Sequence, residues 1–355
     1  LVGYLFYRKL MGEGIGTMAA ALAWTFSGYV ILWGQQYGFC TCMALFTVFM
    51  YFFQCYLNGE KRWKNAGLVL TVTMLLFASY YFLYMIAFFA VFYLLVYSLI
   101  EKRSVKSTAG KVAGLGGMGI LGVLMGGIAL IPIADTFLES ARSGALNGSV
   151  TSGILSPYKS RTIGTIFARF LSNQILGIDK DYTGSLNYYE GMVLAVSILT
   201  ILAVSYFIIK KSTRVRTIIL TVLVIFLSVM PVTSRILIFT KSAHRWCFMI
   251  CFAEALIIGL FLQDVLRERN KKTVLGGGIL AVVLYAALLA YIYSFKNIKI
   301  NNKIVAEVSV FFAVYLILVL VVTNIKKLYK IGSTVILAVL VCELFILNYP
   351  SLWHR

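Results

Sequence analysis

The chain has 355 residues, of which 61% are hydrophobic and 13% are charged. No soluble domain has a core large enough to bury so many apolar side chains, so the composition excludes a soluble globular protein and indicates a polytopic membrane protein. The formal net charge of +19 does not indicate nucleic-acid binding, because the cations lie in short joints between apolar runs and form no separate basic domain.

Apolar runs with short charged joints predict an all-α membrane protein with about 11 full transmembrane helices and one partial helix at residues 1–7, forming a single domain over residues 1–355. The run at residues 66–100 has 35 residues, which is too long for one span, so we predict a break at Ser79–Tyr80–Tyr81. The predicted helices cover residues 15–34, 39–57, 66–79, 81–100, 112–134, 191–209, 217–232, 246–263, 274–293, 304–322 and 332–349.

Residues 135–189 form the one long segment that is too polar to lie in a membrane, and we predict a long water-facing loop there. Within it, apolar side chains recur at the spacing of a helix face, at Ile163, Ile166, Phe167, Phe170 and Leu171. Cations flank this face, so we predict a helix that lies flat on the membrane surface. The alternative is an ordinary helix that caps the bundle.

Lysine and arginine are distributed unevenly between alternate joints. One set of joints holds 20 of them and the other holds 12, five of which lie in the long loop, where the positive-inside rule counts least. We therefore predict that the first set is cytoplasmic and that the long loop, the joint at residues 235–245 and the C-terminus are outside. The cytoplasmic joints lie at residues 8–9, 61–64, 102–111, 210–216, 267–272 and 326–330.

All six cysteines lie within apolar runs, and their spacings are not completed by histidines or a second cysteine pair. Only two histidines are present. The sequence therefore predicts no metal site and no certain cofactor.

The joint at residues 235–245 carries cations on the side where the positive-inside rule disfavours them. Arginine and lysine suit phosphate, the first by its fork geometry and the second as a point charge. We therefore predict an anion site, with contact to lipid headgroups and a Trp246 anchor as the alternative. The candidate phosphate-binding residues are Arg142, Arg235, Lys241, His244 and Arg245.

Carboxylates provide a second set of candidates. Glu254 and Glu343 lie within apolar runs, where ionisable groups are costly and are functional candidates, although hydrogen bonding for packing is the alternative. Asp135 and Glu190 flank the long loop, and either is a candidate general base for an acceptor hydroxyl. A solvated charge at the rim of the membrane is the alternative for both.

Aromatic side chains gather at the predicted outer ends of helices. Interface belts explain such clusters, and a platform on which a sugar stacks is the sharper hypothesis. The residues are Tyr80, Tyr81, Tyr188, Tyr189 and Trp246.

Five stretches together resemble one protein family, and each is weak alone. In their order and spacing, the chain is similar to the bacterial YfhO membrane protein family over nearly all of its length. The stretches are Ser79–Tyr80–Tyr81–Phe82–Leu83–Tyr84–Met85, Leu130–Ile131–Pro132 followed by Ser140–Ala141–Arg142, Tyr188–Tyr189–Glu190–Gly191, His244–Arg245–Trp246, and Glu343–Leu344–Phe345–Ile346–Leu347–Asn348.

The resemblance implies a multispanning glycosyltransferase of the GT-C-like type in the bacterial cytoplasmic membrane. Such proteins take a sugar from a polyprenyl-phosphate carrier on the outer face, and the implied acceptor is a cell-envelope polymer such as lipoteichoic acid. GT-C proteins usually carry an essential aspartate in the first outer loop, for which this sequence has no matching position. We therefore expect that loop, and an outer domain after the last helix, to lie outside this chain.

Two other hypotheses remain beside the glycosyltransferase. One is a transporter or flippase of lipid-linked sugars or envelope precursors, and the other is a non-catalytic membrane scaffold. The sequence shows no clear internal repeat and no pair of interrupted helices in matching halves, which are features typical of many transporters.

Overall fold

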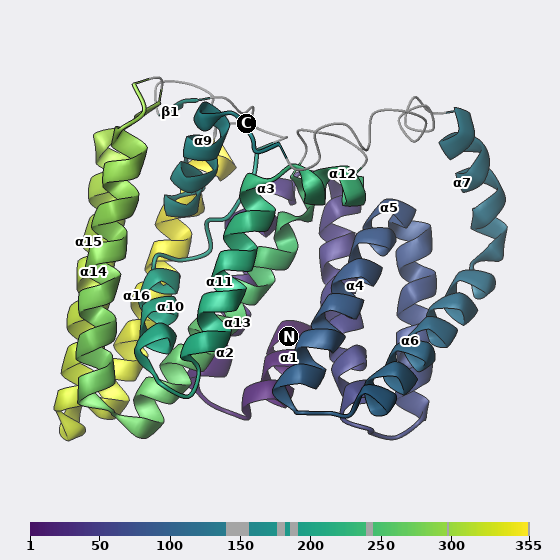
Figure 1. The fold of residues 1–355 in the computed structure, drawn as a ribbon, viewed down its shortest axis with the longest axis horizontal. Coiled ribbons are helices and arrows are strands. Elements are labelled where there is room, and N and C mark those ends of the chain that lie inside the picture. The colour runs from purple at the N-terminus through teal and green to yellow at the C-terminus, as the bar shows by residue number, and fades with distance from the viewer. Residues whose placement is uncertain (140–155, 176–181, 185–190, 239–243, 297, 354–355) are drawn as a thin grey trace. The chain divides into compact units, whose positions relative to one another are not determined.

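The computed structural model describes residues 1–139, 156–175, 182–184, 191–238, 244–296 and 298–353 (Figure 1). The chain divides into two compact units, which are described separately. Unit 1 comprises Leu1–Lys9, Trp33–Ser152 and Leu237–Phe239, and unit 2 comprises Leu10–Leu32, Gly153–Ile236 and Thr240–Arg355.

The secondary structure is almost entirely helical, so the predicted all-α membrane class is confirmed. Eight described helices are long and apolar enough to cross a membrane, or up to nine if α11 and α12 form one bent span, against the eleven predicted. Unit 1 holds most of α1 (Val2–Met11), together with α4 (Tyr37–Leu57), α5 (Trp63–Ile100), α6 (Val105–Met125) and α7 (Gly127–Glu139).

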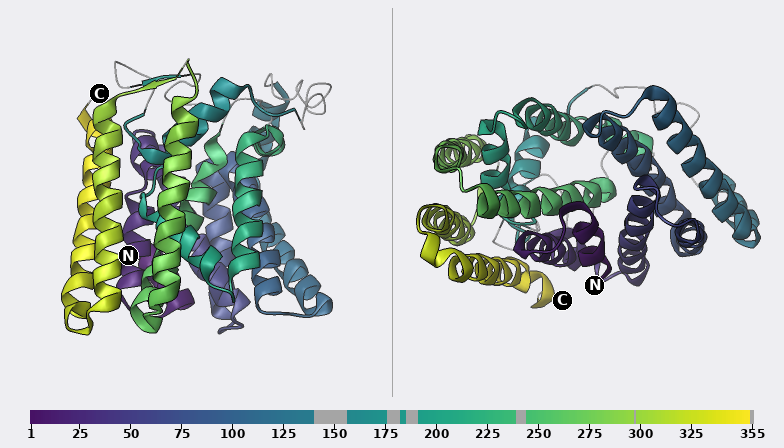
Figure 2. Two further views of the ribbon diagram at one scale, coloured as in Figure 1. Left: turned by 60° about the vertical axis from the view of Figure 1, so that its left-hand side comes forward. Right: turned by 90° about the horizontal axis from the view of Figure 1, so that it is seen from below.

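Unit 2 contains the remaining helices and a two-stranded antiparallel ribbon. Its helices α14, α15 and α16 stand side by side (Figures 1 and 2). The elements are α2 (Ile15–Thr25), most of α3 (Gly28–Trp33), α9 (Ser160–Leu171), β1 (Tyr182–Thr183), α10 (Leu199–Ile209), α11 (Arg214–Val229), most of α12 (Val232–Ile238), η2 (Arg245–Cys247), α13 (Phe248–Glu268), α14 (Lys271–Tyr293), β2 (Lys299–Ile300), α15 (Asn302–Asn324), η3 (Lys326–Leu328) and α16 (Tyr329–Trp353).

The predicted break in the longest apolar run is confirmed. Ser79, inside α5, has extended backbone angles of φ −172° and ψ 111°. Gly67 packs against Phe52, and the Tyr97 hydroxyl donates a hydrogen bond to Asn58 at 3.2 Å. Residues 67 and 97 would be about 45 Å apart on a straight helix, yet both lie beside the last turns of α4. The chain therefore reverses at Ser79 and makes two antiparallel halves.

Several predicted boundaries are wrong, most clearly in two of the apolar runs. The run at 112–134 is divided at Gly126, where α6 ends, and α7 continues to Glu139, so Asp135 lies inside a helix and not at the start of a loop. The run at 191–209 is helical only from Leu199 onward. Residues 191–198 are buried but belong to no helix or strand.

Helix α9 forms where the apolar spacing predicts it, and it packs against helices of unit 2. The Phe167 ring meets the Tyr291 ring of α14 edge-on, with 5.4 Å between their centroids. Thr165 and Arg169 are buried on the same helix, at 0% and 2% exposure. This packing agrees with the alternative of a helix that caps the bundle.

The charged joints of each unit gather at one end. In unit 1, Lys111 donates a hydrogen bond to the Tyr56 carbonyl at 2.8 Å, which joins the ends of α4 and α6. In unit 2, the Lys210 ammonium pairs with Asp264 at 2.6 Å and with Glu268 at 2.7 Å, at the ends of α10 and α13. Strands β1 and β2 pair at the opposite end of unit 2. The alternation of joints expected from the sequence is therefore present within each unit.

Cysteine labelling tests which end faces outside. We expect Lys159→Cys and Lys299→Cys to react with a membrane-impermeant maleimide in intact cells, because both positions are exposed at the end that carries β1 and β2. Lys106→Cys and Lys271→Cys, also exposed, should react only after permeabilisation. Cys40 and Cys342 are exposed and are first replaced by serine. Labelling of position 106 or 271 in intact cells would contradict the predicted orientation.

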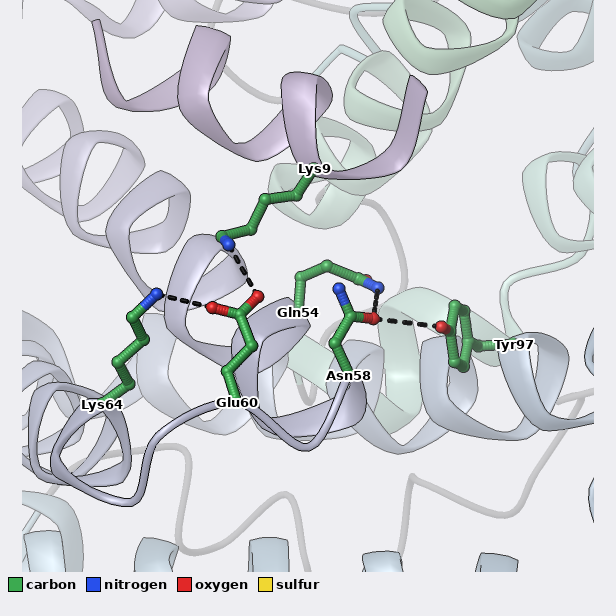
Figure 3. Close-up of polar contacts among 6 residues, drawn as sticks. All are labelled: Lys9, Gln54, Asn58, Glu60, Lys64 and Tyr97. Atoms are coloured by element: carbon green, nitrogen blue, oxygen red, sulfur yellow. Dashed lines mark hydrogen bonds and ion pairs between the residues drawn. The ribbon is translucent and has the colours of Figure 1, made fainter. Parts of the chain in front are cut away.

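Glu60 connects three helices of unit 1 through two lysines (Figure 3). Its carboxylate lies 2.6 Å from the Lys9 ammonium of α1 and 2.5 Å from the Lys64 ammonium of α5. Burial by itself raises the pKa of the Glu60 carboxyl, but hydrogen bonds from Lys64 and Lys9 and their charges lower it to about 2. Beside it, the Asn58 Oδ1 atom accepts hydrogen bonds from Gln54 and Tyr97, which ties α4 to the second half of α5.

The depressed pKa predicts an acid-dependent contribution to stability. Because the pKa is about 2 in the folded protein against 4.5 ordinarily, the contribution is full above pH 4.5 and is lost as the pH falls toward 2. We expect Glu60→Gln to cost about 1–2 kcal/mol at pH 7, less than the whole shift would give because water screens the pair. Thermal unfolding in detergent measures this, and the difference from the unaltered protein should fall by about half at pH 3 and be mostly gone near pH 2.

The matched control is Glu101→Gln, since Glu101 is an exposed glutamate in the next joint of the same unit. It should unfold like the unaltered protein at both pH values. A Glu60→Gln deficit that stays the same from pH 7 to pH 3 would contradict the proposed role of the charge.

Candidate functional site: a buried cationic cluster in unit 2

Helix α9 brings Arg169 into the interior of unit 2, where its side chain is 2% exposed. The helix can approach its neighbours closely at Gly164, where a methyl group would lie 2.5 Å from the Ile298 Cδ1 atom. The charge of Arg169 acts on the Tyr182 hydroxyl and on the Cys247 thiol. The charge of Arg169 therefore reaches η2, the short helix that precedes α13.

A second segment contributes Arg235, which is 7% exposed. Proline has no N–H, so α11 cannot continue through Pro231, and α12 leaves at an angle of 72° to it. This turn buries Ser234, whose Oγ atom accepts hydrogen bonds from the Tyr158 hydroxyl at 3.3 Å and the Trp246 indole N–H at 3.1 Å. Ser234 thus connects the loop before α9, α12 and the start of α13.

The third segment carries His244 and Arg245. The His244 ring, 1% exposed, packs against the Tyr158 ring with 5.2 Å between centroids. Burial raises the pKa of Tyr158, and the hydrogen bond to Ser234 and the charge of Arg235 oppose that rise. The Tyr29 hydroxyl of α3 donates a hydrogen bond to the Arg245 carbonyl at 2.7 Å, which fixes the backbone there.

The fold therefore places four basic residues from three segments in one region of unit 2, here named the cationic cluster: Arg169, Arg235, His244 and Arg245. A group of this kind, at the end of a bundle of apolar helices, can hold an anion with charge-assisted hydrogen bonds. Arginine offers a planar fork that matches two oxygens of a phosphate or carboxylate.

The candidate aromatic residues differ in position. Trp246 is 3% exposed and donates its indole N–H to Ser234, so it packs behind the cations and presents no open ring face. Tyr80 and Tyr81 lie in unit 1, just after the reversal of α5 at Ser79, and the rings of Tyr81 and Phe82 meet edge-on at 5.8 Å. Asp135 also belongs to unit 1 and is exposed on α7. Five other candidates lie outside the described residues: Arg142, Lys241, Tyr188, Tyr189 and Glu190.

The two intramembrane carboxylates have different surroundings. Glu343, on α16, is 0% exposed and accepts hydrogen bonds from the Ser197 hydroxyl, the Ile198 N–H and the Tyr315 hydroxyl. Glu254, on α13, is 9% exposed, and its Oε2 atom accepts no hydrogen bond from the described residues. A buried carboxyl oxygen without a donor is costly, so Glu254 remains a functional candidate in the membrane interior.

Sequence reasoning did not single out Tyr158, Ser234 and Arg169 as site residues. Tyr158 and Ser234 carry no charge, and only the fold brings them to His244 and Trp246. For Arg169, the neighbouring small residues Gly164 and Ala168 were an available signal, since small side chains on a helix are typical of a face in close contact.

In the described part of the chain, no group of three histidine, cysteine or acidic side chains could hold a metal ion. The donor groups of the cationic cluster are basic and aromatic, which suits an anion and not a cation. The chemistry available at this site is therefore the binding of a negatively charged group.

Comparison with known proteins gives the family. No curated protein and no solved structure matches the chain. The family model described as bacterial membrane protein YfhO matches residues 1–352, which is nearly the whole sequence. Together with the multi-pass helical fold, this match agrees with the resemblance expected from the sequence. The chain therefore belongs to the YfhO family of bacterial membrane proteins.

Proposed function

We propose that this protein is a glycosyltransferase that takes a sugar from a polyprenyl-phosphate carrier at the outer face of the bacterial cytoplasmic membrane. The acceptor is a cell-envelope polymer such as lipoteichoic acid. The cationic cluster binds the phosphate of the carrier. The observation that supports this proposal is the gathering of Arg169, Arg235, His244 and Arg245 from three segments of unit 2 beside Tyr158.

The geometry of a lipid-linked donor explains why cations belong at the end of a helical bundle. Its polyprenyl tail stays in the bilayer, its phosphate lies at the level of the headgroups, and its sugar points into water. Arg245 stands where η2 leads into α13, at the mouth of a membrane-spanning helix, and Arg235 lies in the short helix α12. Each therefore lies close to the depth that the carrier phosphate occupies.

The transfer itself needs a base as well as a phosphate site. The bond between the sugar C1 atom and the phosphate oxygen breaks, C1 bonds to an acceptor hydroxyl oxygen, and the hydroxyl proton passes to the base. Polyprenyl phosphate leaves with the electron pair of the broken bond, and the cationic cluster stabilises its charge. Glu190 is the candidate for the base.

A second function, the movement of lipid-linked sugars across the membrane, is favoured by interrupted helices in unit 2. The chain is unwound at residues 191–198, before the 11-residue helix α10, and α11 and α12 are bent by 72°. Helices interrupted in the membrane interior are typical of secondary transporters.

Reconstitution distinguishes the two functions. The full-length protein in lipid vesicles is given a radiolabelled polyprenyl-phosphate sugar and a lipoteichoic acid acceptor. Label that appears on the acceptor supports the glycosyltransferase. Label that crosses the bilayer while still linked to the carrier supports the transporter and contradicts the proposal.

A further inference from the structure

A buried segment of irregular backbone, residues 191–198 and here named the irregular segment, lies in unit 2 and forms no helix or strand. Every side chain in it is buried, and Met192 and Val193 are 0% and 1% exposed. Backbone groups at membrane depth that lack a helical partner must find one elsewhere in the protein. The partners that hold this segment identify its role.

Glu343 holds the C-terminal end of the irregular segment, where α10 begins. Its carboxylate accepts the Ile198 N–H at 2.8 Å and the Tyr315 hydroxyl at 2.8 Å, and it also accepts the Ser197 hydroxyl. The first N–H groups of a helix have no partner within the helix, and the helix dipole favours an anion at that end. Glu343, from α16, therefore caps α10 with its carboxyl group.

Val193, within the irregular segment, makes hydrogen bonds to two cysteines at the start of α13. Its N–H lies 3.4 Å from the Cys247 sulfur, and its carbonyl accepts the Cys251 thiol at 3.3 Å. The neighbouring Ala195 carbonyl accepts the Gly28 N–H at 2.8 Å, so α3 holds the same segment from another side. Cys247 ends η2, the element that begins with Arg245.

We propose that Glu343 is a positioning residue for the cationic cluster. It acts through the irregular segment. The carboxyl group of Glu343 holds Ser197 and Ile198 by hydrogen bonds, and the segment in turn holds Val193 against Cys247. Cys247 ends η2, so the irregular segment supports the start of α13 and positions Arg245 and its neighbour His244. The link to anion binding depends on the proposed function, whereas the anchoring of the segment does not.

The reactivity of the buried cysteines measures the anchoring without any ligand. Cys247 and Cys251 are buried beside Val193, Cys42 and Cys55 are buried in unit 1, and two other cysteines, at positions 40 and 342, are exposed. The full-length protein is treated with N-ethylmaleimide, and mass spectrometry follows the modification of each cysteine. The exposed pair reports that the reagent acts, and the pair in unit 1 reports the integrity of the rest of the chain.

Glu343→Gln keeps the shape of the side chain but replaces one accepting oxygen by an NH2 group that can only donate. One oxygen of Glu343 accepts from both Ser197 and Tyr315, so the exchange weakens the hold on the segment, and we expect Cys247 to react about 10-fold faster, which corresponds to about 1.4 kcal/mol. Cys42 and Cys55 should react at the rate of the unaltered protein. The matched control is Tyr315→Phe, which removes one donor but leaves the bonds to Ser197 and Ile198, and should leave Cys247 protected.

A second measurement, binding of a radiolabelled polyprenyl phosphate to the same variants, tests the link to the cationic cluster. Glu343→Gln should weaken binding by up to about 10-fold, and Tyr315→Phe should not. Unchanged protection of Cys247 in Glu343→Gln, or equal acceleration at Cys42 and Cys55, would overturn the anchoring. Faster reaction at Cys247 with unchanged binding would overturn the positioning role. If the unaltered protein binds no polyprenyl phosphate, the proposed function fails, and the Cys247 rate alone decides the anchoring.

Discussion

Replacing Arg245 with alanine should weaken the binding of a polyprenyl-phosphate sugar by about 10- to 150-fold, because one charge-assisted hydrogen bond contributes about 1.5–3 kcal/mol and each decade of affinity is about 1.4 kcal/mol. The backbone at this position is held by the Tyr29 hydroxyl, which does not depend on the arginine side chain. The variant should therefore fold and insert normally. Sugar transfer at limiting donor concentration, and direct binding of the labelled donor, measure the loss.

Two variants sharpen this test. Arg245→Lys should recover part of the affinity, since it keeps the charge and loses the fork that matches two phosphate oxygens. Lys299→Ala removes an exposed cation at the same end of unit 2 and should bind the donor like the unaltered protein. If Arg245→Ala and Arg235→Ala both leave transfer unchanged at limiting donor, the phosphate is held elsewhere.

Chain length and hydropathy were sufficient to predict the reversal of α5. A run of 35 apolar residues cannot fit one span of about 30 Å, and the serine and tyrosines at 79–81 mark its most polar point. The backbone does leave the helical conformation at Ser79. The polar residues at 79–81 and the limit that the bilayer sets on the length of one span both place the break at the same point, so the prediction was possible from the sequence.

The run at 191–209 shows where hydropathy is insufficient. It is as apolar as a transmembrane helix, yet residues 191–198 form no helix, and partners distant in the sequence satisfy several of their backbone groups. These partners are Glu343 at Ile198, Cys247 and Cys251 at Val193, and Gly28 at Ala195. A window of consecutive residues cannot contain this information, so a helix was predicted throughout.

The candidate site was predictable only in part from the sequence. Cations in a joint where the charge bias disfavours them identified Arg235, His244 and Arg245. The same reasoning only counted Arg169 among the cations of the long loop, and did not expect it to be buried at 2% exposure. Ser234 was missed because a single serine has no pattern, and its importance comes from the two hydrogen bonds that it accepts.

Two glycines allow α2 and α13 of unit 2 to pack with their backbones in contact. A methyl group added to Gly16 would lie 2.3 Å from the Gly259 carbonyl oxygen, and one added to Gly259 would lie 2.6 Å from the Gly16 carbonyl oxygen. Neither obstacle is the end of a flexible side chain, so the helices themselves would have to separate. The contact supports the same helix, α13, that follows the cationic cluster, and small residues are the usual means of close packing between membrane helices.

Gly16→Ala should therefore destabilise the protein by about 1–3 kcal/mol or more, the usual range when extra carbon atoms are forced into a packed interior. The matched control is Gly117→Ala in α6, where a methyl group would have nothing within 4 Å. Because alanine favours helices over glycine, this control should be neutral or up to about 1 kcal/mol more stable. Thermal unfolding of the purified variants in detergent compares the two.

Equal melting temperatures for Gly16→Ala and Gly117→Ala would mean that α2 and α13 are not in backbone contact. A deficit confined to Gly16→Ala would locate the tight contact at the helix pair that follows the cationic cluster.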